Sequence, residues 1–352
     1  MTKRMKIALV CLMTAVIGFA IYGWRDFTNS RNEVGSTAWE EEDEAERDRI
    51  AFDFNADSAY AFVKAQCDFG PRPMNTPAHD TCRDWIIGKF KQYGCKVMTQ
   101  KVDLKGYDGT VLHASNIMAQ YRPELTTRIL LCAHYDSRPW ADNDPDPNNW
   151  RKPILAANDG ASGVGVMIEV ARMLQKVASG THKISSLELG VDFVCFDAED
   201  WGTPQWADVE DKADSWALGA QYFAAHMPEG YEARYGILLD MVGGQGAKFY
   251  QEAMSQQFAE PIVKKVWKAA RRAGYGSYFP KATGGAITDD HIPMNEVAKI
   301  PTIDIIPYYP DCRQSSFGPT WHTLSDDMDH IDKMTLKAVG QTLVEVLFTE
   351  QK

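Results

Sequence analysis

Four short runs of mostly apolar residues constrain the fold of this chain more than any other feature of its sequence. The runs are Arg128–Ala133, Val191–Phe196, Ile237–Met241 and Ile303–Ile306. Continuous apolar runs of this length suit strands that are covered on both faces, as the central strands of a parallel sheet are. The chain is therefore expected to build its core around such a sheet.

Helices and further strands are predicted around these runs. Apolar residues recur at helical spacing between the first two runs, namely at Val164, Met167, Ile168, Ala171 and Leu174. Capping residues or a proline begin two earlier helices, over residues 55–67 and 77–93, and strand-like segments follow at 96–102 and 116–121. This alternation favours the α/β class, as a three-layer α/β/α sandwich with a mixed, largely parallel central sheet. With no internal repeat and no second domain boundary, residues 50–352 are expected to form a single catalytic domain.

The N-terminal segment predicts export. Lys3, Arg4 and Lys6 precede an uncharged, mostly apolar run over residues 7–24. The run is near the lower length limit for a membrane-spanning helix and slightly long for the core of a signal peptide, so cleavage after Ala20 is the alternative. The basic side is expected to stay in the cytoplasm. We therefore expect a periplasmic protein that residues 7–24 anchor in the inner membrane.

Charge and cysteine content narrow the functional classes. Residues 25–49 are polar and then strongly acidic, which predicts a solvated tether. The net charge of −11 argues against nucleic acid as a partner, because phosphate binding requires clustered Lys and Arg. Cys132 and Cys195 lie inside apolar runs and are expected to be buried thiols. Cys67, Cys82 and Cys95 are the candidates for a disulfide outside the cytoplasm.

Acidic and histidine residues gather where the predicted strands end. Taken singly, Asp159 is readily explained as a helix cap, Glu199 and Asp200 as a solvated turn, and His322 as a loop residue. Together they would meet at the carboxyl edge of one sheet, where ligands bind in such folds. Mixed histidine and carboxylate side chains suit zinc. The set is His134, Asp159, Glu199, Asp200, Asp240 and His322.

These motifs resemble the zinc-dependent aminopeptidase family, from about Asp53 to the C-terminus and including the early sequence Phe-Gly-Pro-Arg-Pro at residues 69–73. The glutaminyl-peptide cyclotransferase (glutaminyl cyclase) branch is the most similar. That resemblance lies in residues 238–241, in Asp-Asp-His-Ile-Pro at residues 289–293, and in Trp-His-Thr at residues 321–323.

The resemblance implies a reaction and a set of roles. It implies zinc-dependent cyclisation of an N-terminal glutamine of peptides or proteins to pyroglutamate, with release of ammonia. One zinc per chain would be held by Asp159, Asp200 and His322. Glu199 would be the general base and acid, and Asp240 and Asp290 would complete the catalytic network. Animal cyclases carry Glu where this chain has Asp200, and they carry a Cys before the position of His134.

A two-zinc aminopeptidase is the main alternative. In that enzyme His134 and Asp240 would bind a second zinc, and a bridging water would attack the peptide bond. For the cyclase the substrate side chain is short, so its pocket should be narrow and aromatic, and Trp321, Trp201 and Trp206 are its predicted walls. Within the family that the chain resembles, hydrolytic members usually carry another residue before this ligand histidine, so Trp321 directly before His322 favours the cyclase.

Overall fold

The computed structural model describes residue 50, residues 52–180 and residues 187–350. The predicted anchor at residues 7–24 and the tether at residues 25–49 lie outside the described residues. The helices are α2 (Ala56–Cys67), α3 (Pro77–Gln92), α4 (Ala161–Ala178), α5 (Leu218–Ala225), α6 (Ala253–Arg272), α7 (His291–Glu296) and α8 (Lys333–Glu350). The strands are β1 (Lys96–Lys105), β2 (Val111–Tyr121), β3 (Arg128–His134), β4 (Gly190–Phe196), β5 (Gly236–Leu239) and β6 (Thr302–Ile305). No helix in these described ranges has the length and apolar character needed to cross a bilayer.

One six-stranded sheet organises the domain, in the order β1-β2-β4-β3-β5-β6. The four predicted apolar runs are β3, β4, β5 and β6, and they run parallel to one another. The two earlier strands, β1 and β2, extend the sheet antiparallel beyond β4. The predicted mixed, largely parallel sheet is therefore confirmed. The third run was predicted too long, because β5 ends at Leu239 and Met241 already lies in a turn with positive φ.

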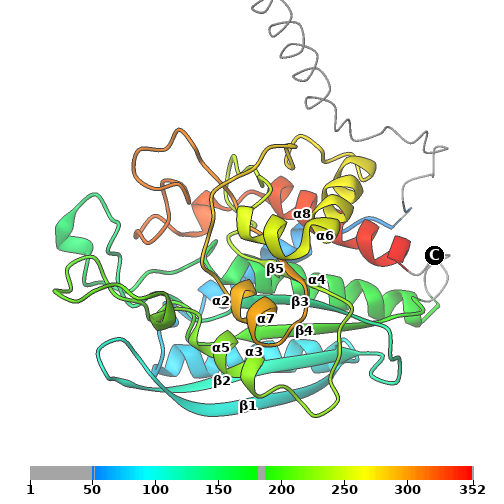
Figure 1. Ribbon diagram of the computed structural model, residues 1–352, viewed down its shortest axis with the longest axis horizontal. Helices are drawn as coiled ribbons and strands as arrows, with labels where there is room; N and C mark the ends of the chain where they lie inside the picture. Colours follow the sequence, from blue (N-terminus) through cyan, green and yellow to red (C-terminus); the bar gives the residue numbers. More distant parts are fainter. Residues whose placement is uncertain (1–49, 51, 181–186, 351–352) are drawn as a thin grey trace, which may run out of the picture. The chain divides into compact units, whose positions relative to one another are not determined.

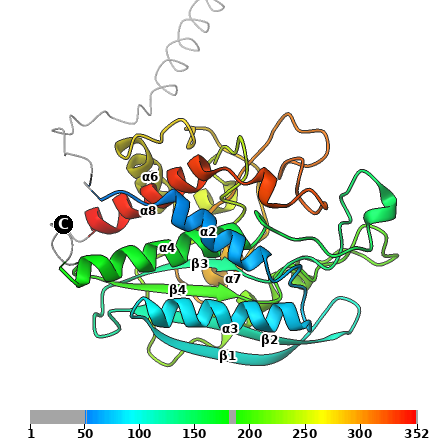
Figure 2. The ribbon, with the colours of Figure 1, turned by 180° about the vertical axis from the view of Figure 1, so that it is seen from behind.

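Both faces of the sheet are covered, which explains the apolar runs. Side chains alternate between two core clusters, so that Leu131 of β3 packs in the larger cluster and its neighbour Leu130 in the other. Helices α2, α3, α4 and α8 lie on the face of the larger cluster, in front of the sheet in Figure 2. Helices α5 and α7 lie on the opposite face, in front of the sheet in Figure 1. The three-layer architecture follows from this double coverage.

The cysteines form no disulfide within the described part of the chain. Cys67, Cys82 and Cys95 are buried thiols, which corrects the expectation of a bridge among them, and Cys132 and Cys195 are buried as predicted. Burial raises the pKa of Cys67 to about 11 and those of Cys82 and Cys95 to about 12. These thiols therefore pack as small apolar side chains.

A buried polar network fixes the turn that follows β4. The Asp197 carboxylate accepts hydrogen bonds from Tyr135 Oη at 2.6 Å and from the backbone N–H of Ser115 at 2.7 Å. His79 Nε2 of α3 lies 2.7 Å from the other oxygen. Burial opposes protonation of His79, but the Asp197 charge and hydrogen bond outweigh it and raise the His79 pKa. This network joins α3, β2 and the end of β3 to the turn that carries Glu199.

Candidate metal and catalytic site

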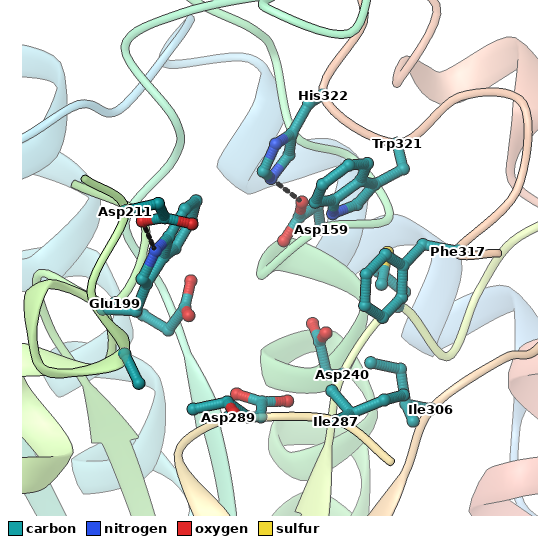
Figure 3. A pocket seen from close by; sticks show the side chains of 14 residues that line it. Asp159, Glu199, Asp211, Asp240, Ile287, Asp289, Ile306, Phe317, Trp321 and His322 are labelled. Atoms are coloured by element: carbon teal, nitrogen blue, oxygen red, sulfur yellow. Dashed lines mark hydrogen bonds and ion pairs between the residues drawn. The ribbon is translucent and has the colours of Figure 1, made fainter. Parts of the chain in front are cut away.

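The carboxyl ends of the parallel strands deliver the predicted site residues to one place. His134 ends β3, Glu199 and Asp200 follow β4, and Asp240 follows β5. Asp159 precedes α4 and His322 lies in the long loop between β6 and α8. Figure 3 shows the side chains of Asp159, Glu199, Asp240 and His322 around a single cavity.

Asp159, Asp200 and His322 form one group of potential metal ligands. The three side chains are buried, and one ligand atom of each lies within 4.8 Å of the others. His322 Nε2 is 3.3 Å from Asp200 Oδ1 and 3.6 Å from Asp159 Oδ2. Zinc–ligand bonds of about 2.0–2.2 Å at tetrahedral angles place neighbouring ligand atoms about 3.3–3.6 Å apart. Asp200 Oδ2 is also buried without a hydrogen-bond partner among the described residues. These donors and their spacing fit a zinc ion.

His134, Asp159 and Asp240 form a second group around the shared Asp159. His134 Nε2 lies 3.0 Å from Asp159 Oδ1, within hydrogen-bonding distance, and 3.4 Å from Asp240 Oδ1. Burial opposes protonation of His134, but the neighbouring carboxylates outweigh it and raise the His134 pKa well above its usual range. His134 therefore lies at hydrogen-bonding distance from Asp159, and its distance to Asp240 is in the same range as the spacings of the first group.

The turn before α4 directs Asp159 toward the other potential ligands, and Asp159 does not cap the helix. The residue at the cap position is Gly160, and no side chain caps this helix. A Cβ at Gly160 would lie 2.9 Å from both the Asp136 carbonyl oxygen and the His134 ring, and its φ of +92° also favours glycine. Asp326 accepts hydrogen bonds from the backbone N–H groups of Asn158 at 2.7 Å and Asp159 at 3.0 Å. The helix-cap explanation of Asp159 is thus excluded.

Three turns at the site hold non-glycine residues in the left-handed region. Ala198 has a φ of 52°, Met241 of 49° and His322 of 54°. Such backbone conformations cost on the order of 1–3 kcal/mol each and persist where surrounding contacts enforce them. They lie directly before Glu199, directly after Asp240 and at His322 itself. The strain is concentrated where the chain turns to present these side chains.

Two carboxylates that sequence reasoning missed orient the ligand-bearing loops. Asp136 accepts the backbone N–H groups of Glu199 and Asp200, each at 3.2 Å. Asp142 forms a two-pronged ion pair with Arg138, with both N···O distances 2.7 Å, and both side chains are buried. The only feature of the sequence that could have indicated Asp136 and Asp142 is their position shortly after His134, in the loop that follows β3.

The pair of Arg138 and Asp142 also contacts two of the potential metal ligands. Arg138 Nη1 lies 3.4 Å from Asp200 Oδ1, and Asp142 Oδ1 lies 3.6 Å from His322 Nδ1. A carboxylate beside Nδ1 favours the tautomer with a proton there, which leaves Nε2 free for a metal. Burial opposes charge on Arg138, but Asp142 and Asp200 keep its pKa raised. The pair therefore positions Asp200 and His322 together.

Replacing Asp142 with asparagine is expected to weaken zinc binding by about 10–100-fold, because outer carboxylates orient ligand histidines. Zinc titration of the metal-free protein with a competing chelator measures the effect. Asp208→Asn, at an exposed loop position, serves as the control. Equal zinc affinity in the two variants would contradict the positioning role of Asp142.

The acidic site retains protons that a bound cation would displace. Burial raises the pKa of Asp240 to about 8, with Asp289 and Asp159 adding to the rise and His134 opposing it. Burial likewise raises the pKa of Glu199 well above its usual range, against the charge of His134. So many buried carboxylates repel one another when ionised. A divalent cation would relieve that repulsion and release protons.

The cavity has a volume of about 320 Å³ and is largely apolar away from its acids. Trp321 and Phe317 lie along one side of it, with ring centroids 4.8 Å apart (Figure 3). Trp321 also stacks on the His322 ring at 3.7 Å. Trp216 lines the cavity as well and stacks parallel to His322. The predicted role of Trp321 as a wall agrees with this placement.

Trp201 and Trp206 do not line the cavity, which corrects their predicted placement. Both rings pack against Trp140 instead, at centroid distances of 5.3 Å and 5.9 Å. Trp216 and Phe317 line the cavity where Trp201 and Trp206 were expected. The choice among tryptophans depends on how the loop after β4 folds back, which residue spacing does not reveal.

Asp289, and not its neighbour Asp290, faces the cavity. Asp290 directly precedes α7 with helical backbone angles, and its side chain is buried in the interior. Burial raises the pKa of Asp289, and burial together with the Asp289 charge raises that of Asp290 further. The Asp-Asp-His-Ile-Pro motif therefore brings an aspartate to the cavity, but Asp289 lines it in place of the predicted Asp290.

The Phe-Gly-Pro-Arg-Pro motif braces the site from outside. Arg72 is fully buried and donates to the carbonyl oxygens of Tyr135, Leu155 and Ala156, at 3.3, 2.9 and 3.0 Å. These carbonyls belong to the segments that follow β3 and precede Asp159. The motif thus ties the N-terminal part of the domain to two site loops.

Comparison with known proteins agrees with this geometry. The glutaminyl cyclase of Bacteroides thetaiotaomicron, solved bound to N-acetylhistamine, is 52% identical, and the similarity covers 84% of this chain and 98% of that chain with a TM-score of 0.80. The glutaminyl-peptide cyclotransferase of Gloydius blomhoffii is 26% identical over 65% of this chain and 63% of its own length. Aminopeptidase YwaD of Bacillus subtilis is 25% identical over 76% of this chain and 51% of its own length.

The chain thus spans about half to two thirds of the length of these two curated relatives, and nearly all of the solved cyclase. The resemblance to the zinc aminopeptidases and to their glutaminyl cyclase branch is confirmed. The model of peptidase family M28 matches residues 116–347, which include all of the site residues described above from His134 to Asp326. The chain belongs to peptidase family M28.

Proposed function

We propose that this protein is a glutaminyl-peptide cyclotransferase, which converts an N-terminal glutamine to pyroglutamate and releases ammonia. The observation that carries the proposal is the joint placement of Glu199 and the Asp159–Asp200–His322 group around one small cavity. A glutamine side chain is short, and a cavity of about 320 Å³ that Trp321 and Phe317 line suits it. The similarity to a solved glutaminyl cyclase supports the same reaction.

The proposed reaction needs no external nucleophile. The α-amine of the substrate attacks its own side-chain amide carbon, a new C–N bond closes the ring, and the bond to the amide nitrogen breaks. Holding the amine folded against the carbonyl removes entropic cost, worth up to about 7–11 kcal/mol in favourable intramolecular reactions. The narrow cavity therefore contributes by restricting the substrate to the folded conformation.

Glu199 handles the proton that must move. Its half-buried carboxyl group faces the cavity, and burial raises its pKa well above the usual range of a glutamate. In the proposed mechanism Glu199 accepts a proton from the attacking amine and returns it to the departing nitrogen, which leaves as ammonia. A bound zinc, held by Asp159, Asp200 and His322, would supply Lewis-acid polarisation of the amide carbonyl.

Asp240 and Asp289 line the cavity beside the reacting amide. Burial raises the pKa of both, and the charge of Asp159 adds to both rises; the charge of Asp289 also raises the pKa of Asp240. Two close carboxyl groups of this kind retain a proton between them. We assign them the binding of the substrate amine and of the leaving amide nitrogen.

The proposal is tested by mass spectrometry of a glutamine-initiated peptide incubated with the full chain, with and without a chelator. We expect the loss of one ammonia from the peptide, and we expect the chelator to abolish it. Readdition of zinc should restore the reaction. Release of the first residue, in place of ammonia, would overturn the cyclase assignment.

The alternative function is a two-zinc aminopeptidase, which the second group of His134, Asp159 and Asp240 favours. The similarity to aminopeptidase YwaD supports the same reading. Metal content discriminates between the two functions. One tightly held zinc per chain is expected for the cyclase, and two for the aminopeptidase.

The proposed partners are peptides and proteins that begin with glutamine. The apolar run at residues 7–24 supports export, so the substrates we propose are exported proteins. Association with the inner membrane through that run is part of the same proposal.

A further inference from the structure

A second cavity lies across a loop from the catalytic cavity. It has a volume of about 500 Å³, within the range of small-ligand sites. Its walls are the hairpin between β1 and β2 and the loop after β4. Its lining includes Lys105, Tyr107, Glu210, Lys212 and Asp214. We call this second cavity the hairpin groove.

One loop separates the hairpin groove from the catalytic cavity. Asp211 and Ala213 line the catalytic cavity, whereas Glu210, Lys212 and Asp214 line the hairpin groove. Successive residues of one loop thus face opposite sides, and all five are exposed. Residues 210–214 therefore form an exposed ridge between the two cavities. A peptide substrate that leaves the catalytic cavity is able to cross this ridge.

An aromatic cluster holds the walls of the hairpin groove together. Tyr107 packs edge-on against Trp140 at 5.7 Å, and Trp140 packs in turn against Trp201 and Trp206. Trp201 Nε1 donates to Asp108 of the hairpin at 3.4 Å. Trp206 stacks on Trp150 at 6.4 Å. The cluster fixes the hairpin to the loops that also carry the catalytic residues.

The charged side chains of the hairpin groove remain available to a ligand. Lys105, Glu210, Lys212 and Asp214 form no ion pair within the described part of the chain, although they line one cavity. Charges of both signs on an exposed polar surface suit a peptide, which presents backbone donors and acceptors and charged side chains. They do not suit nucleic acid, which requires clustered cations.

From the shared ridge, the volume and the unpaired charges, we propose that the hairpin groove binds the residues that follow the N-terminal glutamine of a peptide substrate. The inference rests on the proposed cyclase function and specifies its substrate class. The enzyme would then act faster on longer peptides and protein N-termini than on dipeptides. Lys105 would interact with acidic side chains beyond the second residue.

The test compares kcat/KM of the full chain for a glutamine-initiated dipeptide and two heptapeptides with the same first two residues. One heptapeptide carries aspartates at its later positions and the other carries lysines. Both heptapeptides should be turned over several-fold faster than the dipeptide. Lys105→Glu should lower the ratio of acidic to basic heptapeptide turnover by roughly two- to thirtyfold, since it removes one exposed ion pair with the acidic peptide and creates one with the basic peptide, each worth about 1.4- to 5-fold.

Lys101→Glu is the matched control, because Lys101 is an exposed lysine on the same strand outside the hairpin groove. It makes the same change in net charge and should leave the ratio unchanged. Equal turnover of dipeptide and heptapeptides by the unmodified enzyme, or equal ratios in the two variants, would overturn the groove assignment alone. Failure to cyclise the dipeptide and both heptapeptides would overturn the proposed function, and the groove assignment with it.

Discussion

Replacing Glu199 with glutamine is expected to lower kcat for cyclisation by about 10²–10⁴-fold, the usual contribution of a general acid–base. Glutamine preserves the shape of the side chain but neither accepts the amine proton nor returns it to the departing nitrogen. KM should change little, because Glu199 acts on the proton and not on the bulk of the substrate. Steady-state kinetics with a glutamine-initiated peptide gives both constants.

Zinc binding separates this effect from general damage to the site. Glu199 is not part of the Asp159–Asp200–His322 group, so Glu199→Gln should retain zinc. Glu232→Gln, at an exposed position that does not line the catalytic cavity, is the control and should match the unmodified enzyme. A Glu199→Gln enzyme with unchanged kcat would remove Glu199 from the mechanism.

Replacing His322 with alanine is expected to remove both zinc and activity. His322 is the one nitrogen donor of the Asp159–Asp200–His322 group, and its Nε2 lies 3.3 Å from Asp200 Oδ1. Polarisation by the metal is worth several kcal/mol, so kcat/KM should fall by more than about 10³-fold. Elemental analysis after dialysis and the cyclisation assay provide the two readouts.

The matched control is His330→Ala, since His330 is half exposed and pairs with Asp327 near the same loop. That variant should keep its zinc and its activity. Full zinc content in His322→Ala would move the metal to the group of His134, Asp159 and Asp240. It would then favour the aminopeptidase alternative.

The architecture of the domain was largely predictable because burial on both faces is a local property of a strand. Each of the four apolar runs became a parallel strand, and three of them end at the sheet edge where the polar side chains meet. His134, Glu199 and Asp240 could be placed at one edge on this ground alone. The resemblance then supplied their roles, which residue patterns alone do not specify.

The features that only the tertiary structure decided concern the directions of side chains and the packing of distant segments. Asp289 and Asp290 are neighbours in sequence, but the start of α7 turns one into the cavity and the other into the interior. Trp216 and not Trp201 lines the cavity, because the loop after β4 folds back over His322.

The same distinction explains the remaining differences. The Arg138–Asp142 pair acquires its importance through contacts with Asp200 and His322, which lie far from it along the chain. The expected disulfide is absent from the described residues. Cys67, Cys82 and Cys95 are instead packed as free thiols in the larger core cluster. The sequence alone determined the sheet, its carboxyl edge and the ligand types. The folded chain determined which side chains face one another, because those contacts join residues far apart in sequence and depend on packing that no local pattern encodes.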